Sequence, residues 1–129
     1  MIALDTNVVV RFLVNDDSRQ GRRARDLIAR GETFVGPTVL LEAEWVLRSA
    51  YGFPPTEIQR FFRAFLGLPV MSADEPVRIA RAFDAYAAGL DFADALDVSF
   101  AGATESFATF DTRLARRARR LGIADVKTP

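Results

Sequence analysis

The chain contains no histidine and no cysteine among its 129 residues. Without histidine, neither an imidazole general base nor an imidazole metal ligand is available. Without cysteine, disulfides, thiolate nucleophiles and sulfur-ligated zinc are excluded. Any chemistry must therefore be carried by carboxylates, most directly by holding a hard divalent cation through oxygen ligands.

Long apolar runs and common catalytic motifs are also missing. No apolar run reaches the ~18 residues that a membrane span needs, and the N-terminus lacks the layout of a signal peptide. We therefore expect a cytoplasmic protein that does not enter a membrane. A Ser-His-Asp triad is impossible without histidine, and no glycine-rich phosphate loop ending in Gly-Lys-Ser/Thr is present.

The net charge is zero, but the basic residues are almost all arginine and are clustered. The 17 basic and 17 acidic residues give a net charge of zero, which argues against a nonspecific polycation. Every basic residue except Lys127 is arginine. Two clusters stand out, Arg19, Arg22, Arg23 and Arg25 and then Arg113, Arg116, Arg117, Arg119 and Arg120. Such runs are usually solvated helix faces, although arginine is also suited to bidentate phosphate contacts.

The order of the expected elements predicts an α/β fold. Short strands are expected at residues 1–4, 33–36, 69–72, 107–110 and 125–127, the third at a sheet edge because of its proline. Helices are expected at 19–30, 37–50, from 56, from 74 or 75 to about 89, from 91 to about 102, and at 112–121. This alternation predicts a mostly parallel sheet with helices on both faces. The length suits one domain, residues 1–129.

Two aspartates follow expected strands directly. Asp5 comes after residues 1–4, and Asp111 after residues 107–110. Ligands of open α/β sheets bind outside the carboxyl ends of the strands, so both are candidate metal ligands. Thr6 and Asn7 are candidates to support Asp5 by hydrogen bonds. The alternative for each aspartate is a helix N-cap.

Two further acids lie on expected helices. With Val39 taken as the origin of a helical wheel, Glu42 lies at the border of the apolar stripe and Glu44 points away from it. Glu42 is therefore expected to reach inward, paired with a cation or an arginine. Asp94 has Asp91 and Asp97 three residues before and after it. Asp91 suits an N-cap, and Asp97 could be a secondary ligand, a water-positioning group or a surface residue.

Clustered carboxylates raise one another's pKa, and a bound Mg²⁺ or Mn²⁺ reverses that cost. Such an ion also polarises a phosphate oxygen and generates a nucleophile from water without imidazole. Phosphodiester hydrolysis fits these residue types.

Four segments together resemble PIN-domain nucleases, and more narrowly the VapC-type toxins of bacterial toxin–antitoxin pairs. They are Ile2–Asn7, Val39–Arg48, Asp91–Leu96 and Ala108–Asp111, and the resemblance covers essentially the whole chain. It implies a three-layer α/β/α fold with a sheet of four to five strands. It also implies a Mg²⁺- or Mn²⁺-dependent endoribonuclease.

The resemblance assigns the site residues by position. It implies catalytic roles for Asp5, Glu42, Asp94 and Asp111, with Asp5, Asp94 and Asp111 as metal ligands and Glu42 on a second ion or on the attacking water. Thr6, Asn7 and Thr109 match supporting polar positions. Asp97 stands where many relatives carry histidine and is a further supporting candidate. Arg113, Arg116 and Arg117 are candidates to contact RNA phosphates.

The resemblance further implies a homodimer inhibited by a small antitoxin. Leu41 and Trp45, on a second apolar face of their helix, are candidates for such a surface. Phe61, Phe62, Phe65 and Leu66 are a second candidate set; the alternative for all of them is ordinary core. Two other functions remain open at this point: a phosphohydrolase of small phosphate esters, and a noncatalytic module whose acidic groove captures a basic peptide.

Overall fold

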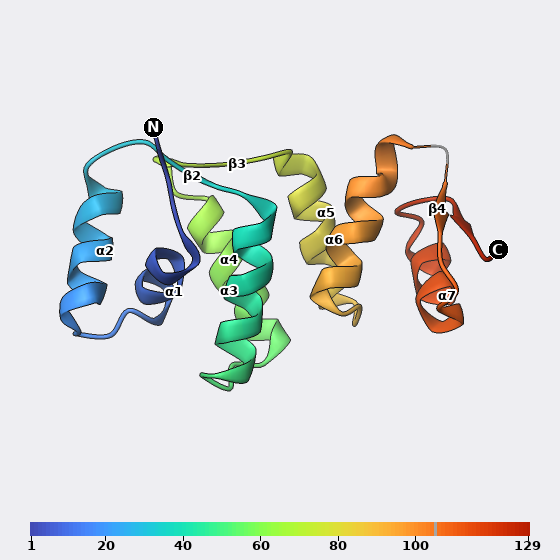
Figure 1. The fold of residues 1–129 in the computed structure, drawn as a ribbon, viewed down its shortest axis with the longest axis horizontal. Coiled ribbons are helices and arrows are strands. Elements are labelled where there is room, and N and C mark those ends of the chain that lie inside the picture. The colour runs from blue at the N-terminus through green and yellow to red at the C-terminus, as the bar shows by residue number, and fades with distance from the viewer. Residues whose placement is uncertain (105) are drawn as a thin grey trace. The chain divides into compact units, whose positions relative to one another are not determined.

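Short strands alternate with helices along the chain. The structure, a computed structural model, describes residues 1–104 and 106–129. The described part contains five strands and seven α-helices, and every strand pairing in it is parallel (Figure 1). The chain divides into two compact units, residues 1–74 and 75–129. The single domain expected from the length stays a prediction.

The N-terminal unit contains three of the strands and four helices. They are β1 (Ile2–Ala3), α1 (Thr6–Val14), α2 (Arg19–Ala29), β2 (Thr33–Val35), α3 (Pro37–Ser49), α4 (Pro55–Leu66) and β3 (Met71–Ala73). The sheet order is β1-β2-β3, with Ile2 opposite Thr33 and Thr33 opposite Met71. β3 is thus an edge strand of this sheet, as predicted. The parallel order places the carboxyl ends of β1 and β2 at one edge, where α1 and α3 begin.

Local sequence explains where the helices start. Prolines occupy the first helical position of α3, α4 and α5, where the missing N–H costs nothing. Ser18 caps α2 by accepting a hydrogen bond from the Gly21 backbone N–H at 3.0 Å. Residues 8–14, read from sequence only as an apolar stretch, belong to α1, which packs between α2 and α3 (Figure 1).

The core of the N-terminal unit is aliphatic and aromatic. Its fully buried side chains include Val9, Val35, Leu40, Leu47, Ile58, Phe62 and Phe65. Phe62 and Phe65 are among the four residues considered above as a second docking surface. Phe62 and Phe65 therefore belong to the core, as the alternative interpretation expected, and each such side chain contributes about 1.5–3 kcal/mol.

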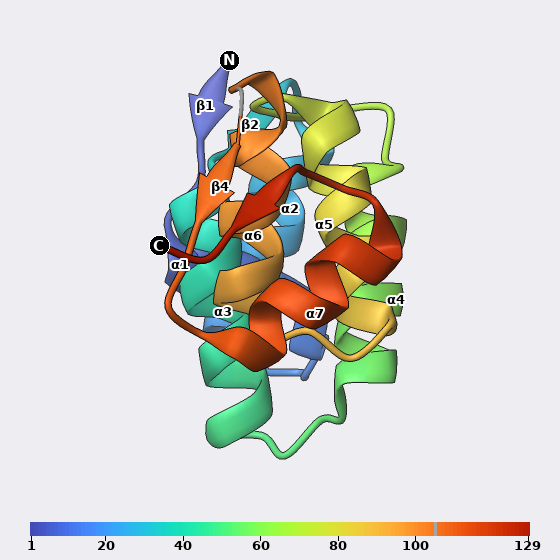
Figure 2. The same cartoon turned by 90° about the vertical axis from the view of Figure 1, so that its right-hand side faces the viewer.

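The C-terminal unit contains two strands and three α-helices. They are α5 (Pro76–Ala87), α6 (Phe92–Phe100), β4 (Phe107–Ala108), α7 (Thr112–Leu121) and β5 (Val126–Lys127). A short 3-10 helix, η1 (Ala101–Ala103), follows α6. β4 and β5 pair in parallel, and α7 connects them (Figure 2). α5 packs on α6 through the rings of Phe83, Tyr86 and Phe92. No α-helix in the described part of the chain is long and apolar enough to cross a membrane.

One predicted boundary in this unit is wrong. The strand expected at 107–110 ends at Ala108, so Asp111 does not end a strand but occupies the N-cap of α7. The reason is local: Asp111 bonds the first N–H groups of α7, which fixes the start of the helix directly after it.

Candidate active site

Asp5 links β1 to α1. It occupies the N-cap position of α1 with extended backbone angles, yet its side chain makes no capping hydrogen bond. Its backbone carbonyl accepts the N–H groups of Val8 and Val9 at 3.1 and 3.2 Å. Helix initiation therefore uses the main chain of Asp5 and leaves its exposed carboxylate available for another partner.

A hydroxyl of α1 holds the carboxylate of Glu42. Thr6 Oγ1 donates a hydrogen bond to Glu42 Oε2 over 3.1 Å, and Thr6 is only 7 % exposed. Since Thr6 directly follows Asp5, this bond brings α3 and its glutamate to the carboxyl end of β1. Nothing in the sequence signals the link, because 36 residues separate the two partners.

The helical wheel assigned the two glutamates of α3 to the wrong environments. Glu44 is the buried one, 3 % exposed, and it accepts a hydrogen bond from Arg48 Nε at 2.8 Å, whereas Glu42 is exposed. The buried positions are Leu40, Ala43, Glu44 and Leu47, so the true stripe is rotated from the one centred on Val39. The expectation that Glu42 reaches inward is therefore wrong, and its place in the candidate site rests on Thr6.

Asp94 is an acid of the C-terminal unit whose pKa is raised by its surroundings. It lies in the first turn of α6 and is half-buried. Burial raises its pKa above the ordinary value of 3.8, and the charges of Asp91, Asp111 and Asp97 raise it further, in that order of size. Asp111 belongs to a different element from the other three. The tertiary structure therefore gathers four acids within this unit.

Asp111 caps α7 with one of its oxygens. Oδ1 accepts hydrogen bonds from the backbone N–H groups of Arg113 and Leu114, each at 3.0 Å. The backbone N–H of Asp111 donates to Thr109 Oγ1, also at 3.0 Å. Within the described residues no hydrogen bond reaches Oδ2. The capping alternative is therefore realised, through one of the two carboxylate oxygens.

The remaining candidates have simpler surroundings. Asp91 occupies the N-cap position of α6, as expected, but its side chain makes no capping hydrogen bond. Asp97 and Asn7 are exposed. Among the arginines of α7, Arg113 and Arg116 are exposed, while Arg117 Nη1 donates to the Gly89 carbonyl at 2.9 Å.

The acids fit a hard divalent cation in chemistry and charge. No group of three or more acidic side chains in residues 1–104 and 106–129 is arranged so that it could hold a metal ion. The donors, however, are all carboxylate oxygens, which Mg²⁺ and Mn²⁺ prefer. A cation would also neutralise the repulsion that raises the pKa of Asp94.

Comparison with known proteins identifies the family. The family model of the PIN domain matches residues 2–120 and thus spans both units. Neither the curated proteins nor the solved structures gave a significant match. PIN domains are three-layer α/β/α folds, so the predicted fold class is confirmed; they are typically nucleases that use divalent metal ions. Because the match covers far more than half of the sequence, this chain belongs to the PIN domain family.

Proposed function

We propose that this PIN domain is a Mg²⁺- or Mn²⁺-dependent endoribonuclease, the toxin of a cytoplasmic toxin–antitoxin pair. PIN domains generally are metal-dependent nucleases, which supports the reaction class. The absence of histidine and cysteine supports the same class, since carboxylates then have to perform the hydrolysis.

The observation that carries the proposal is the crowding around Asp94. Burial and the charges of Asp91, Asp111 and Asp97 raise the pKa of Asp94, so its ionisation costs free energy unless a cation compensates it. Asp94 and Asp111 would be metal ligands of the C-terminal unit, and Asp5, whose side chain makes no capping hydrogen bond, is assigned a metal-ligand role in the N-terminal unit. When bound, the ion would polarise the scissile phosphate and lower the pKa of a water molecule. The family match covers residues 2–120 and so includes the positions of all these acids.

The chain's own residues then orient the reactants. Glu42, held by Thr6 through one oxygen, keeps its other oxygen for the attacking water or for a second ion. Thr109 positions Asp111 by accepting its backbone N–H. Asn7 and Asp97 are exposed neighbours in sequence of these groups and have supporting roles.

Contacts to the RNA are assigned to α7. Arg113 and Arg116 are exposed, so their guanidinium groups are accessible to phosphates. Arg117 has the weaker claim because it donates to a backbone carbonyl.

A protein partner is supported by Trp45 on α3. Its indole is 60 % exposed, and exposed tryptophans are frequent anchors of interfaces. We assign this face to a homodimer or to an antitoxin that masks the acids. Light scattering at micromolar concentration should give a dimer mass; a monomer contradicts the dimer, while Trp45→Ala should weaken whichever complex uses this face.

The decisive experiment compares substrates and metals. Purified protein is incubated with labelled RNA and with a generic phosphate ester, in Mg²⁺, Mn²⁺ or EDTA. The protein should cleave the RNA but not the phosphate ester, and only when Mg²⁺ or Mn²⁺ is present. Asp5→Asn, Glu42→Gln, Asp94→Asn and Asp111→Asn should each abolish cleavage.

Two exposed acids outside the candidate site, Glu32 and Asp125, provide matched controls. Glu32→Gln and Asp125→Asn should cleave RNA like the wild type. Cleavage that persists in EDTA or in Asp5→Asn contradicts the metal mechanism. Hydrolysis of the ester instead of RNA favours the phosphohydrolase, and no cleavage of any RNA favours a binding module.

A further inference from the structure

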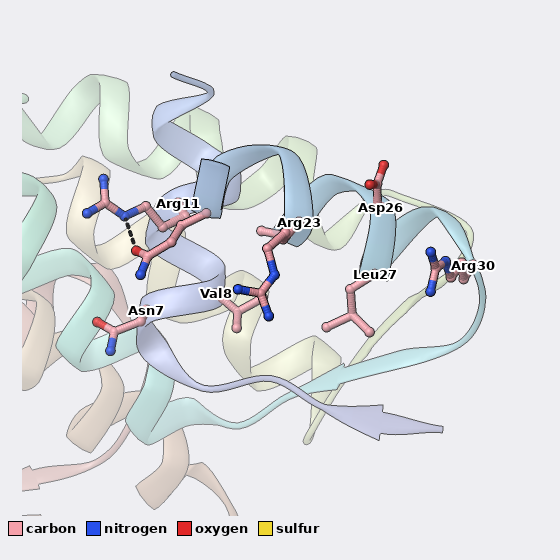
Figure 3. A pocket seen from close by; sticks show the side chains of 9 residues that line it. Asn7, Val8, Arg11, Arg23, Asp26, Leu27 and Arg30 are labelled. Atoms are coloured by element: carbon pink, nitrogen blue, oxygen red, sulfur yellow. Dashed lines mark hydrogen bonds between the residues drawn. The ribbon is translucent and has the colours of Figure 1, made fainter. Parts of the chain in front are cut away.

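A groove runs between α1 and α2 of the N-terminal unit. Its volume is about 480 Å³. Its lining includes Arg11, Arg23 and Arg30 together with Asn7, Val8 and Leu27 (Figure 3). In the sequence Arg23 belongs to an arginine cluster, but the groove forms only when α1 and α2 pack together.

Arg23 and Arg30 present uncommitted positive charge along the groove. Seven residues are nearly two helical turns, so the two arginines share one face of α2 about 10 Å apart along its axis. Both side chains are exposed, and neither makes a hydrogen bond or ion pair within the part of the chain that the structure describes. Asp26 also lines the groove, but its carboxylate points away from the Arg23 guanidinium (Figure 3).

Arg11, unlike Arg23 and Arg30, is bonded to neighbouring side chains. Its Nε donates to Gln20 Oε1 at 3.1 Å and its Nη1 to Asp16 Oδ2 at 3.4 Å. These bonds tie α1 to α2 and to the loop between the helices. They stabilise the walls of the groove and leave the recognition of an anion to Arg23 and Arg30.

We propose that this groove binds the phosphate backbone of single-stranded RNA, with Arg23 and Arg30 as the phosphate ligands. The inference rests on the proposed nuclease function and adds a substrate path to it. A polyanion that approaches clustered carboxylates is repelled and needs positive charge nearby. Asn7, which lines the groove, follows Asp5 by two residues in the chain. Guanidinium groups bind phosphates bidentately, and Val8 and Leu27 offer apolar contact to sugars and bases.

The test measures RNA binding without cleavage. Fluorescence anisotropy of a labelled single-stranded RNA is recorded in EDTA between 50 and 200 mM salt. Arg23→Gln/Arg30→Gln removes two phosphate contacts, so the slope of log K against log[salt] should become shallower by about 1.4. Between 50 and 200 mM salt both proteins should lose affinity. The fold-loss of the variant should be roughly seven times smaller than that of the wild type.

A double variant of equal charge is the control. Arg19→Gln/Arg60→Gln changes an exposed arginine on α2 and one on α4, neither of which lines the groove, and should keep the wild-type slope. An unchanged slope in Arg23→Gln/Arg30→Gln overturns the groove assignment, and wild-type cleavage in Mg²⁺ then leaves the nuclease proposal standing. Competition by poly-glutamate as effective as that by RNA also overturns it, in favour of an acidic protein partner. A shifted slope without any cleavage supports the groove and contradicts the nuclease.

Discussion

Replacing Asp94 by asparagine should stabilise the metal-free protein at neutral pH. The carboxylate is half-buried in the first turn of α6, with Asp91 and Asp97 one turn away on either side. Each like-charge pair at this spacing costs about 0.2–0.5 kcal/mol, and both burial and Asp111 add to that cost. The favourable interaction of a negative charge with the helix N-terminus, about 0.3–1 kcal/mol, opposes this. Because the pKa of Asp94 is raised, the unfavourable contributions dominate.

The expected gain is at most about 0.5 kcal/mol, since the pair repulsions and the opposing helix-terminus interaction are of similar size. With an unfolding entropy of about 2.1 cal/mol/K per residue, that raises the Tm of this chain by up to about 2 °C. The gain depends on pH in a defined direction. A raised folded-state pKa means that the folded protein binds the proton more tightly than the unfolded chain. Asp94 therefore favours folding below the ordinary value of 3.8, and this contribution is lost as pH rises through the raised pKa.

Thermal unfolding by circular dichroism in EDTA, at pH 4 and pH 7, measures this effect. Asp94→Asn should exceed the wild type in Tm at pH 7 and much less at pH 4, while the exposed control Asp125→Asn should change neither. Adding Mg²⁺ should stabilise the wild type and have little effect on Asp94→Asn, since a ligand stabilises only the state that binds it. A lower Tm for Asp94→Asn at pH 7, or a difference independent of pH, would refute the argument from like-charge crowding.

Substitutions at four further residues test individual contacts. Glu44→Ala should lower the free energy of unfolding by about 1–3 kcal/mol, because it removes a buried carboxylate bonded to Arg48. Glu42→Ala should instead abolish RNA cleavage and change the free energy of unfolding by less than about 0.5 kcal/mol. Urea titrations and cleavage assays on both variants decide this, and the reverse pattern would exchange the two roles. Thr6→Val should reduce kcat about 10–100-fold with Thr6→Ser restoring it, as expected of a positioning hydroxyl; loss in both variants would instead indicate a packing role. Ser18→Ala should cost about 0.5–2 kcal/mol in urea unfolding through the lost cap of α2, and an unchanged midpoint would contradict that cap.

Much of the local structure follows from the residues themselves. Pro37 predicted the start of α3, because proline is favoured in the first turn of a helix, and the start expected at residue 74 or 75 for α5 lies within two residues of the observed one. Strand limits were less predictable. β4 ends at Ala108 because Asp111 is recruited to cap α7, and a strand and a cap compete for the same few residues. The parallel pairings were expected from the alternation of elements and are present in both units.

The sequence by itself determined the chemistry of this protein: without histidine and cysteine, carboxylate oxygens are left as ligands, and four segments in the right order indicated the PIN family. Only the tertiary structure decided which carboxylates are available. It buried Glu44 beside Arg48 and bonded Glu42 to Thr6, the reverse of the burial that the helical wheel gave. The physical reason is that burial depends on which face of a helix meets its neighbours. That face is set by packing between segments far apart in the chain, whereas donor chemistry belongs to each residue alone.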